Sequence, residues 1–177
     1  YGEQVKTVFI GPCIAKKGEA ACEELAGEVN AALTFVELRQ MFLEADIDAE
    51  AVEPTDFDPP HAGVGALFPI SRGLLQAANI REDLLQGEVV AADGRTSFVD
   101  AIREFAAGDL DAKLLEVLCC EGCIMGAGLS NTLPLFHRRK LVSQYVRRRL
   151  EDAQRRQAAG QPDPADAFDD LDLSRTY

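Results

Sequence analysis

Two short apolar runs end directly in cysteine-containing loops, and this arrangement constrains the fold more than any other feature of the sequence. The run VKTVFI (5–10) is rich in β-branched and aromatic residues and is followed by GPC, which ends at Cys13. The run KLLEVL (113–118) leads into CCEGC (119–123). Runs of this kind, stopped by turn residues, are typical of buried strands. We therefore expect each cysteine motif to follow a strand directly.

Helical patterns lie between these and other strand-like runs. AALTF (31–35) is predicted to be a second strand, and residues 88–91 a weak one that ends at ADG. Residues 49–73 are rich in Pro, Gly and Asp and predict a long loop. Helices are predicted at about 18–28 and near 73–79. Two more helices are predicted from apolar residues that share one face at helical spacing. The first contains Leu38, Met41, Phe42 and Ala45, and the second contains Phe98, Ala101, Ile102 and Phe105.

Strands that alternate with amphipathic helices favour an α/β fold with a mostly parallel sheet flanked by helices. Ligands of such sheets bind beyond the carboxyl ends of the strands. Because both cysteine motifs follow strands, we expect Cys13 and the 119–123 group at the same edge of the sheet.

The character of the chain changes after Leu129. Residues 138–156 predict a long basic helix with a narrow apolar stripe, and residues 160–173 form a Pro- and Asp-rich segment that we interpret as a linker or docked arm. The basic face can be a solvated surface, part of a signalling helix, or a binding surface for an anionic partner. The apolar stripe consists of Val142, Tyr145, Val146 and Leu150.

Charge and composition exclude several classes of protein. The net charge of −12 argues against nucleic acid as a partner, because the phosphate backbone would repel such a surface. No apolar run approaches the roughly 20 residues of a membrane span, and no signal-peptide pattern is present. The 5 cysteines are odd in number and clustered, which favours reduced thiols in the cytoplasm over a disulfide framework. The chain begins at Tyr1, so we expect it to be a segment of a longer protein.

Thiolates are soft ligands that suit iron–sulfur clusters or zinc, and glycines allow the backbone to approach a cluster closely. Cys120 and Cys123 form a C-x-x-C pair. Redox dithiols and zinc knuckles use the same spacing, although neither histidine lies where it would help a zinc site. Cys119 and Cys22 also fit plain packing cysteines.

GPCIAKKGE and EVLCCEGCIMGAG together resemble the second and third signature motifs of the iron-only hydrogenase large subunit, C-terminal domain, which carries the H-cluster. The family patterns are roughly M-P-C-x-x-K-x-x-E and E-x-M-x-C-x-x-G-C-x-x-G-G-G-Q-P. The likeness covers about residues 3–130. It implies that residues 1–135 are the C-terminal part of the H-cluster domain, one lobe of it, and that 136–177 are a basic helix and acidic linker toward a further domain.

The resemblance also implies roles for individual residues. Cys13, Cys120 and Cys123 match ligands of a 4Fe–4S cluster, and Cys123 matches the thiolate that bridges to a two-iron subsite. Lys16 matches a lysine that pairs with a cyanide ligand of that subsite, and Glu19 matches a carboxylate on the proton route. Spacing alone favours a charge pair at the start of a helix for these two side chains, whereas the resemblance favours the roles beside the cluster. Lys17 is expected to be solvated.

The match supplies three thiolates, whereas such a cluster normally takes four. In the family, the fourth comes from an upstream T-S-C-C-P motif, so we expect the isolated segment to retain little cluster. Cys119 and Cys22 are the other thiols available. Four positions depart from the pattern of catalytic members and resemble sensory hydrogenases: Gly11 and Leu118 in place of Met, Gln76 in place of Glu, and GAG in place of G-G-G-Q-P.

These observations leave three hypotheses for the intact protein. The first is a sensory, hydrogenase-like protein that binds H2 or turns it over slowly and signals to upstream and downstream domains. The second is a competent hydrogenase that exchanges electrons with a carrier such as ferredoxin and reduces protons. The third is a non-catalytic 4Fe–4S module for electron transfer or cluster assembly. None of the three involves nucleic acid or a membrane.

Overall fold

The computed structural model describes residues 4–58 and 61–161, and the strands in it form two separate parallel pairs. The chain divides into two units, and each is described by itself. Within the described residues, unit 1 comprises 4–56 and Gly126–Thr132, and unit 2 comprises the remainder. Each unit carries one of the strand pairs.

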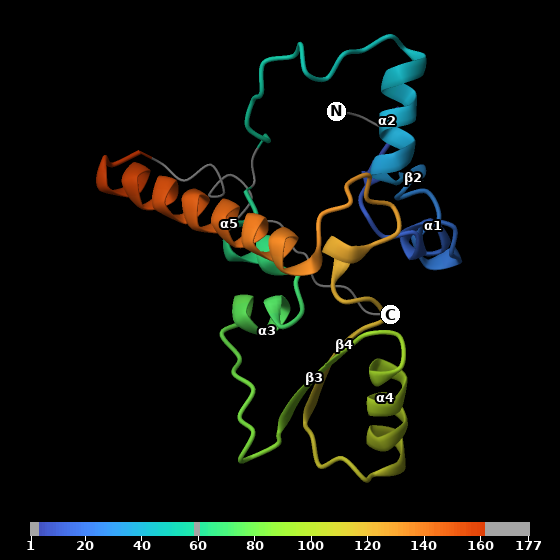
Figure 1. Ribbon diagram of the computed structural model, residues 1–177, viewed down its shortest axis with the longest axis vertical. Helices are drawn as coiled ribbons and strands as arrows, with labels where there is room; N and C mark the ends of the chain where they lie inside the picture. Colours follow the sequence, from blue (N-terminus) through green and yellow to red (C-terminus); the bar gives the residue numbers. More distant parts are fainter. Residues whose placement is uncertain (1–3, 59–60, 162–177) are drawn as a thin grey trace. The chain divides into compact units, whose positions relative to one another are not determined.

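Unit 1 is a strand–helix–strand unit followed by a helix (Figure 1). The strands β1 and β2 pair in parallel, with Val8 opposite Ala31 and Ile10 opposite Leu33. A parallel pair needs a crossover between its strands, and the helices α1 and η1 provide it. The elements are β1 (Val8–Ile10), α1 (Ala15–Ala20), the 3-10 helix η1 (Glu23–Leu25), β2 (Ala31–Leu33) and α2 (Phe35–Glu44).

The start of α2 is fixed by a capping box. The Thr34 side chain accepts the Glu37 N–H at 3.2 Å, and the Glu37 carboxylate accepts the Thr34 N–H at 2.8 Å. These bonds satisfy backbone donors that a helix terminus would otherwise leave unpaired. Because Thr34 caps α2, β2 ends at Leu33, two residues before the predicted end of this strand.

The crossover in unit 1 differs from the single helix predicted at about 18–28. The helix begins earlier, at Ala15, and ends at Ala20. Cys22 then takes an extended conformation, with φ −76° and ψ 156°, before η1 begins. An extended residue interrupts the helical hydrogen-bond series, so the segment folds as two short helices.

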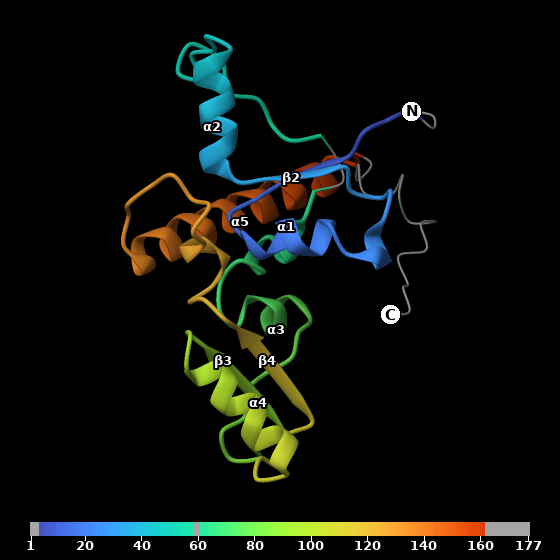
Figure 2. The same cartoon turned by 90° about the vertical axis from the view of Figure 1, so that its right-hand side faces the viewer.

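Unit 2 contains a second parallel pair, β3 (Val89–Asp93) with β4 (Leu114–Leu118), connected through α4 (Ser97–Ala107). The helix α4 lies along the strand pair in both views (Figures 1 and 2). Gly108 ends α4 in a left-handed conformation, a common helix terminus. The other elements are the 3-10 helix η2 (Gly63–Leu67), α3 (Gly73–Ala77), the 3-10 helix η3 (Cys123–Met125) and α5 (Leu135–Ala158).

A small core joins α5 to η2 and η3. Leu67, Ile70, Ile124 and Val146 are buried together. Val142, Tyr145 and Leu150 are partly buried against them, so the predicted apolar stripe of the basic helix faces this core. None of the helices within residues 4–58 and 61–161 is long and apolar enough to span a membrane.

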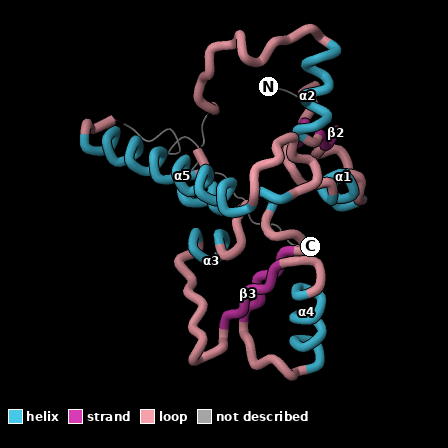
Figure 3. The backbone as a smooth tube through the Cα atoms, viewed as in Figure 1, coloured by secondary structure: helices cyan, strands magenta, loops and turns pink. Residues whose placement is uncertain are grey.

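The predicted fold class is confirmed: the chain is α/β, with parallel strands flanked by helices. The expectation of one shared sheet edge is wrong, because Cys13 follows β1 and the 119–123 group follows β4, and these strands belong to different sheets. In each sheet, a helical crossover of its own connects the two strands. Of the long loop predicted at 49–73, residues 49–58 contain no helix or strand (Figure 3), whereas Gly63–Leu67 form the 3-10 helix η2, so the prediction is confirmed only in part. The boundary predicted at residue 135 stays a prediction, and the acidic segment lies outside the described residues from 162 onward.

Candidate metal centre

The loop that carries Cys120 and Cys123 follows β4 directly, and its Gly122 lies closely against residues 69–71. Gly122 has φ +92°, and a Cβ there would lie 2.5 Å from the Pro69 carbonyl oxygen. The Ile124 N–H donates to the same oxygen at 3.2 Å, and the Met125 N–H donates to the Gly122 oxygen at 2.9 Å. Only glycine fits this close approach without strain. The backbone between the two thiols is therefore fixed by its contact with the preceding turn.

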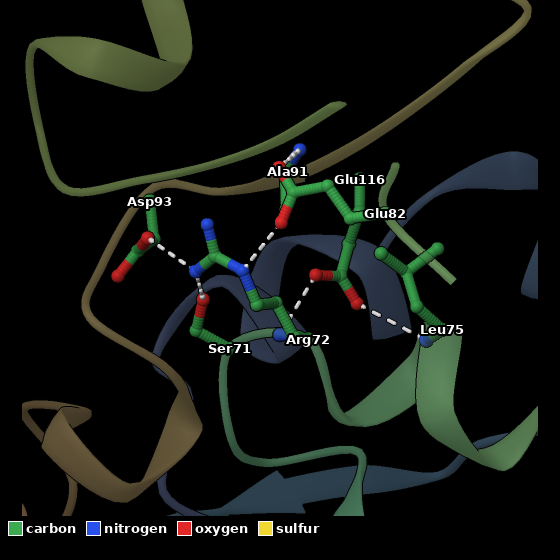
Figure 4. A network of polar contacts seen from close by, with 7 residues as sticks. All are labelled: Ser71, Arg72, Leu75, Glu82, Ala91, Asp93 and Glu116. Carbon is green, nitrogen blue, oxygen red and sulfur yellow. Dashed lines mark hydrogen bonds and ion pairs between the residues drawn. The ribbon is translucent and has the colours of Figure 1, made fainter. Parts of the chain in front are cut away.

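A buried carboxylate fixes the strand that leads into this loop (Figure 4). Glu116, in the middle of β4, is 8% exposed. Its carboxylate accepts the backbone N–H of Arg72 at 2.8 Å and that of Leu75 at 3.4 Å. A buried charge is tolerated only with such partners. Glu116 thus connects β4 to the first turn of α3.

Arg72, which donates its backbone N–H to Glu116, directly precedes α3. It is left-handed, with φ +67°, and its Nε donates to Glu82 at 2.8 Å while Nη1 lies 4.0 Å from Asp93 (Figure 4). The hydrogen bond raises the pKa of the Arg72 guanidinium and lowers the pKa of the Glu82 carboxyl. Glu82 also accepts the Ala91 N–H of β3 at 3.3 Å. The turn before α3 is therefore tied to both strands of the pair.

All five cysteines lie among the described residues, and none of them forms a disulfide. Cys13, Cys22, Cys120 and Cys123 are half-buried, whereas Cys119 is exposed. The interpretation of Cys119 as a buried packing cysteine is therefore wrong: it points out of the turn that follows β4. Cys22 remains compatible with packing.

Cys13 lies in unit 1, in the loop after β1. Backbone bonds fix the residues before it: the Gly11 N–H donates to Leu33 at 3.0 Å, and the Gly128 N–H donates to Pro12 at 2.9 Å. A Cβ on Gly128 would lie 2.8 Å from the same Pro12 oxygen. The last glycine of GAG is therefore required sterically, because it allows residues 126–132 to lie directly against the Pro12–Cys13 loop.

Gly11 stands where catalytic members of the family have methionine. A Cβ at this position would lie 2.7 Å from the ring of Phe9. The aromatic ring thus occupies the space beside Gly11, and the departure from the family pattern has a local structural counterpart.

Lys16 and Glu19 form the charge pair that the spacing alone suggested. Lys16 Nζ lies 2.5 Å from the Glu19 carboxylate, and both side chains are roughly half exposed. Lys17 is not simply solvated, as expected from the sequence: its ammonium donates to Glu37 at 2.8 Å and to the Ala32 carbonyl at 3.1 Å. It joins α1 to β2 and α2, since the crossover brings the helix alongside the strand.

Lys17 gives unit 1 a pH-dependent contact that can be measured. Its hydrogen bond, followed by those from Thr34, lowers the pKa of the Glu37 carboxyl from 4.5 to about 2. A carboxyl whose pKa is lowered by folding stabilises the native state above its ordinary pKa. This stabilisation is lost as the pH falls from 4.5 through about 2. Glu37→Gln keeps an acceptor for the Thr34 N–H but removes the charge, so we expect a weaker acid dependence of the thermal midpoint over this window.

The exposed Glu53→Gln on the loop after α2 is the control and should leave that acid dependence unchanged. If the thermal midpoint of Glu37→Gln changed with pH in parallel with that of the unmodified chain, the acid dependence would not come from the Glu37 carboxylate.

The predicted cysteine ligands fall into two groups. Cys120 and Cys123 share one anchored loop of unit 2, and Cys13 lies in unit 1. Within the described part of the chain, no three side chains of His, Cys, Asp or Glu converge in a way that would hold a metal ion. The donor chemistry nevertheless fits an iron–sulfur cluster, because two half-buried cysteines that form no disulfide lie three residues apart in one glycine-containing loop.

Sequence reasoning missed the residues that support the loop: Glu116, Arg72, Ile124 and Arg138. A charged residue inside the apolar run LLEVL was the available signal for Glu116, since buried charges need partners. Arg72 had no comparable signal, because its side chain pairs with Glu82 and Asp93 on other elements. Arg138 had none, because it donates to the backbone carbonyl of Ile124, 14 residues away.

Comparison with known proteins agrees with this arrangement. The model of the family described as iron only hydrogenase large subunit, C-terminal domain, matches residues 1–127. A probable cytosolic Fe-S cluster assembly factor from Drosophila ananassae is 44% identical over 59 residues, which cover 30% of this chain and 12% of that protein. The chain therefore spans only a small part of this relative's length. Because the family match covers most of the chain, the chain belongs to the iron-only hydrogenase large subunit, C-terminal domain family.

Proposed function

We propose that this chain binds an iron–sulfur cluster as part of a longer, hydrogenase-like protein that senses H2 or turns it over slowly. Cys120 and Cys123 would supply two thiolates of a 4Fe–4S cluster, and Cys13 a third. The observation that carries the proposal is the anchored Cys120–Cys123 loop, in which two half-buried cysteines that form no disulfide lie on either side of a glycine packed on the Pro69 carbonyl. When bound, the cluster would supply one-electron chemistry, and a two-iron subsite beside it would supply H2 chemistry.

Lys16 and Glu19 follow Cys13 at the spacing of the family motif, which supports a role beside the cluster. In that role, the Lys16 ammonium would bind an anionic ligand and Glu19 would hold a transferable proton. Both groups would first have to exchange their mutual ion pair for these contacts. The partners in this proposal are an electron carrier such as ferredoxin and the remaining domains of the same chain. The proposed location is the cytoplasm.

The second candidate is a non-catalytic 4Fe–4S module for electron transfer or cluster assembly. Two observations favour it. One relative is named as a cytosolic Fe-S cluster assembly factor. In addition, Lys16 and Glu19 bind each other in an ion pair, so neither side chain needs a two-iron subsite as its partner.

Cysteine substitutions test the cluster proposal in the full-length protein. After anaerobic reconstitution, we expect Cys120→Ala and Cys123→Ala to abolish stoichiometric binding of iron and sulfide and the EPR signal of the reduced cluster, because each removes a thiolate. Cys13→Ala is expected to do the same.

Cys22→Ala and the exposed Cys119→Ala are the matched controls and should retain the cluster. Equal loss in all five variants, or none in Cys120→Ala and Cys123→Ala, would refute the assignment. A stable, stoichiometric cluster in residues 1–177 alone would show that no upstream thiolate is needed. Infrared bands of metal-bound CO and CN after expression with the hydrogenase maturation proteins would favour the first candidate, and their absence would favour the second.

A further inference from the structure

The helix α5 contacts the cysteine loop through one arginine. Arg138, in the first turn of α5, donates from Nη1 to the Ile124 carbonyl at 2.7 Å, and its Nε donates to the Leu133 carbonyl. Ile124 follows Cys123 directly in the chain. Hydrogen bonds from a charged donor are stronger than neutral ones. The guanidinium therefore holds the peptide unit between Ile124 and Met125, one residue beyond the second thiol.

The same loop is held from the opposite side. The Ile124 N–H donates to Pro69 at 3.2 Å, and the Ile124 side chain, 7% exposed, packs with Val146 of α5 and with Leu67. The peptide groups on both sides of the Ile124 Cα thus have fixed partners. The second of these peptide groups also carries the Met125 N–H, which donates to the Gly122 carbonyl at 2.9 Å, so the peptide groups before and after Cys123 both have partners. Since peptide planes are rigid, these bonds fix the direction in which Cys123 leaves the backbone.

We propose that Arg138 is a positioning residue for Cys123, and that α5 belongs functionally to the cysteine loop. The proposal rests on the proposed function, because it assumes that Cys123 is a cluster ligand. The family match ends at residue 127 and α5 begins at Leu135, so the family assignment gives this helix no role. The fork of the guanidinium reaches two carbonyls from fixed positions, which a lysine ammonium on a flexible stem does not reproduce.

The test compares Arg138→Ala, Arg138→Lys and the control Arg139→Ala in the full-length protein. Arg139 is the next residue on α5 and is exposed. Hydrogen exchange of the cluster-free protein reports on the Ile124 and Met125 amides. We expect Arg138→Ala to accelerate their exchange by about tenfold or more, the effect of losing one charge-assisted hydrogen bond. Arg138→Lys should restore part of the protection, and Arg139→Ala should change nothing.

The second readout is the cluster itself. With Arg138→Ala, we expect a shifted midpoint potential and an altered EPR signal of the reconstituted cluster, because one thiolate is no longer held in place. A variant that merely weakened the unit would accelerate exchange equally throughout α4 and α5, and that result would overturn the proposal. Unchanged exchange at Ile124 together with an unchanged potential would also overturn it. If the unmodified protein binds no cluster, the proposed function fails, and the exchange data still decide whether Arg138 holds the loop.

Discussion

Gly122→Ala is expected to lower the free energy of unfolding of unit 2 by roughly 2–5 kcal/mol. Two costs add at this position: a non-glycine residue with positive φ is strained by about 1–2 kcal/mol, and overpacking adds about 1–3 kcal/mol. The overpacking arises because the added methyl group would lie 2.5 Å from the Pro69 oxygen. Chemical denaturation, followed by exchange of unit 2 amides, measures the change.

Gly94 provides a matched control. It has the same φ of +92°, but nothing lies within 4 Å of the position of its Cβ. Gly94→Ala should therefore show the strain alone, about 1–2 kcal/mol. Equal destabilisation by the two substitutions would mean that the contact with Pro69 does not hold the cysteine loop. We also expect Gly122→Ala, unlike Gly94→Ala, to impair retention of the cluster.

Val146→Asp is expected to unfold the part of unit 2 around η2, η3 and α5. Val146 is 4% exposed and packs with Leu67, Ile70 and Ile124. An aspartate there loses the packing of a buried side chain and places an unpaired carboxylate among apolar groups, a cost of about 4 kcal/mol or more. Loss of thermal cooperativity and fast exchange of the Ile124 amide are the measurements.

Leu141→Asp is the control on the same helix. Its side chain is 44% exposed, so the new carboxylate stays hydrated. The expected change is within about 1 kcal/mol, as for other surface substitutions. Comparable damage by both variants would show that α5 is destabilised by charge at any position, and that its stripe is not a core face.

The elements with a strong local pattern could be predicted from the sequence. The 24 residues of α5 were predicted within three residues at each end, because its apolar stripe repeats at helical spacing. The strands β1 and β4 were predicted from their β-branched and aliphatic runs. The cysteine positions at the ends of these strands followed from the same runs.

Other features depend on contacts between distant residues and left no local pattern. The assignment of β1 and β4 to separate sheets depends on which strands pair, and period-two alternation does not specify the partner. The bond from Arg138 to Ile124 joins residues 14 apart, and the bond from Glu116 to Arg72 joins residues 44 apart. Lys17 is exposed as expected, but its ion pair was not predicted, because its partner, Glu37, lies 20 residues away on α2.

The two-stranded sheets have a consequence for the behaviour of the chain at high concentration. Within residues 4–58 and 61–161, each strand has a strand neighbour on one edge only. On β1, Val8, Phe9 and Ile10 are between 39% and 48% exposed. Parallel strands are normally covered on both faces, and an unpaired apolar edge is a template on which another strand can add. Strand addition from a neighbouring molecule therefore competes with the monomer, and the yield of monomeric protein should fall with concentration before any element unfolds.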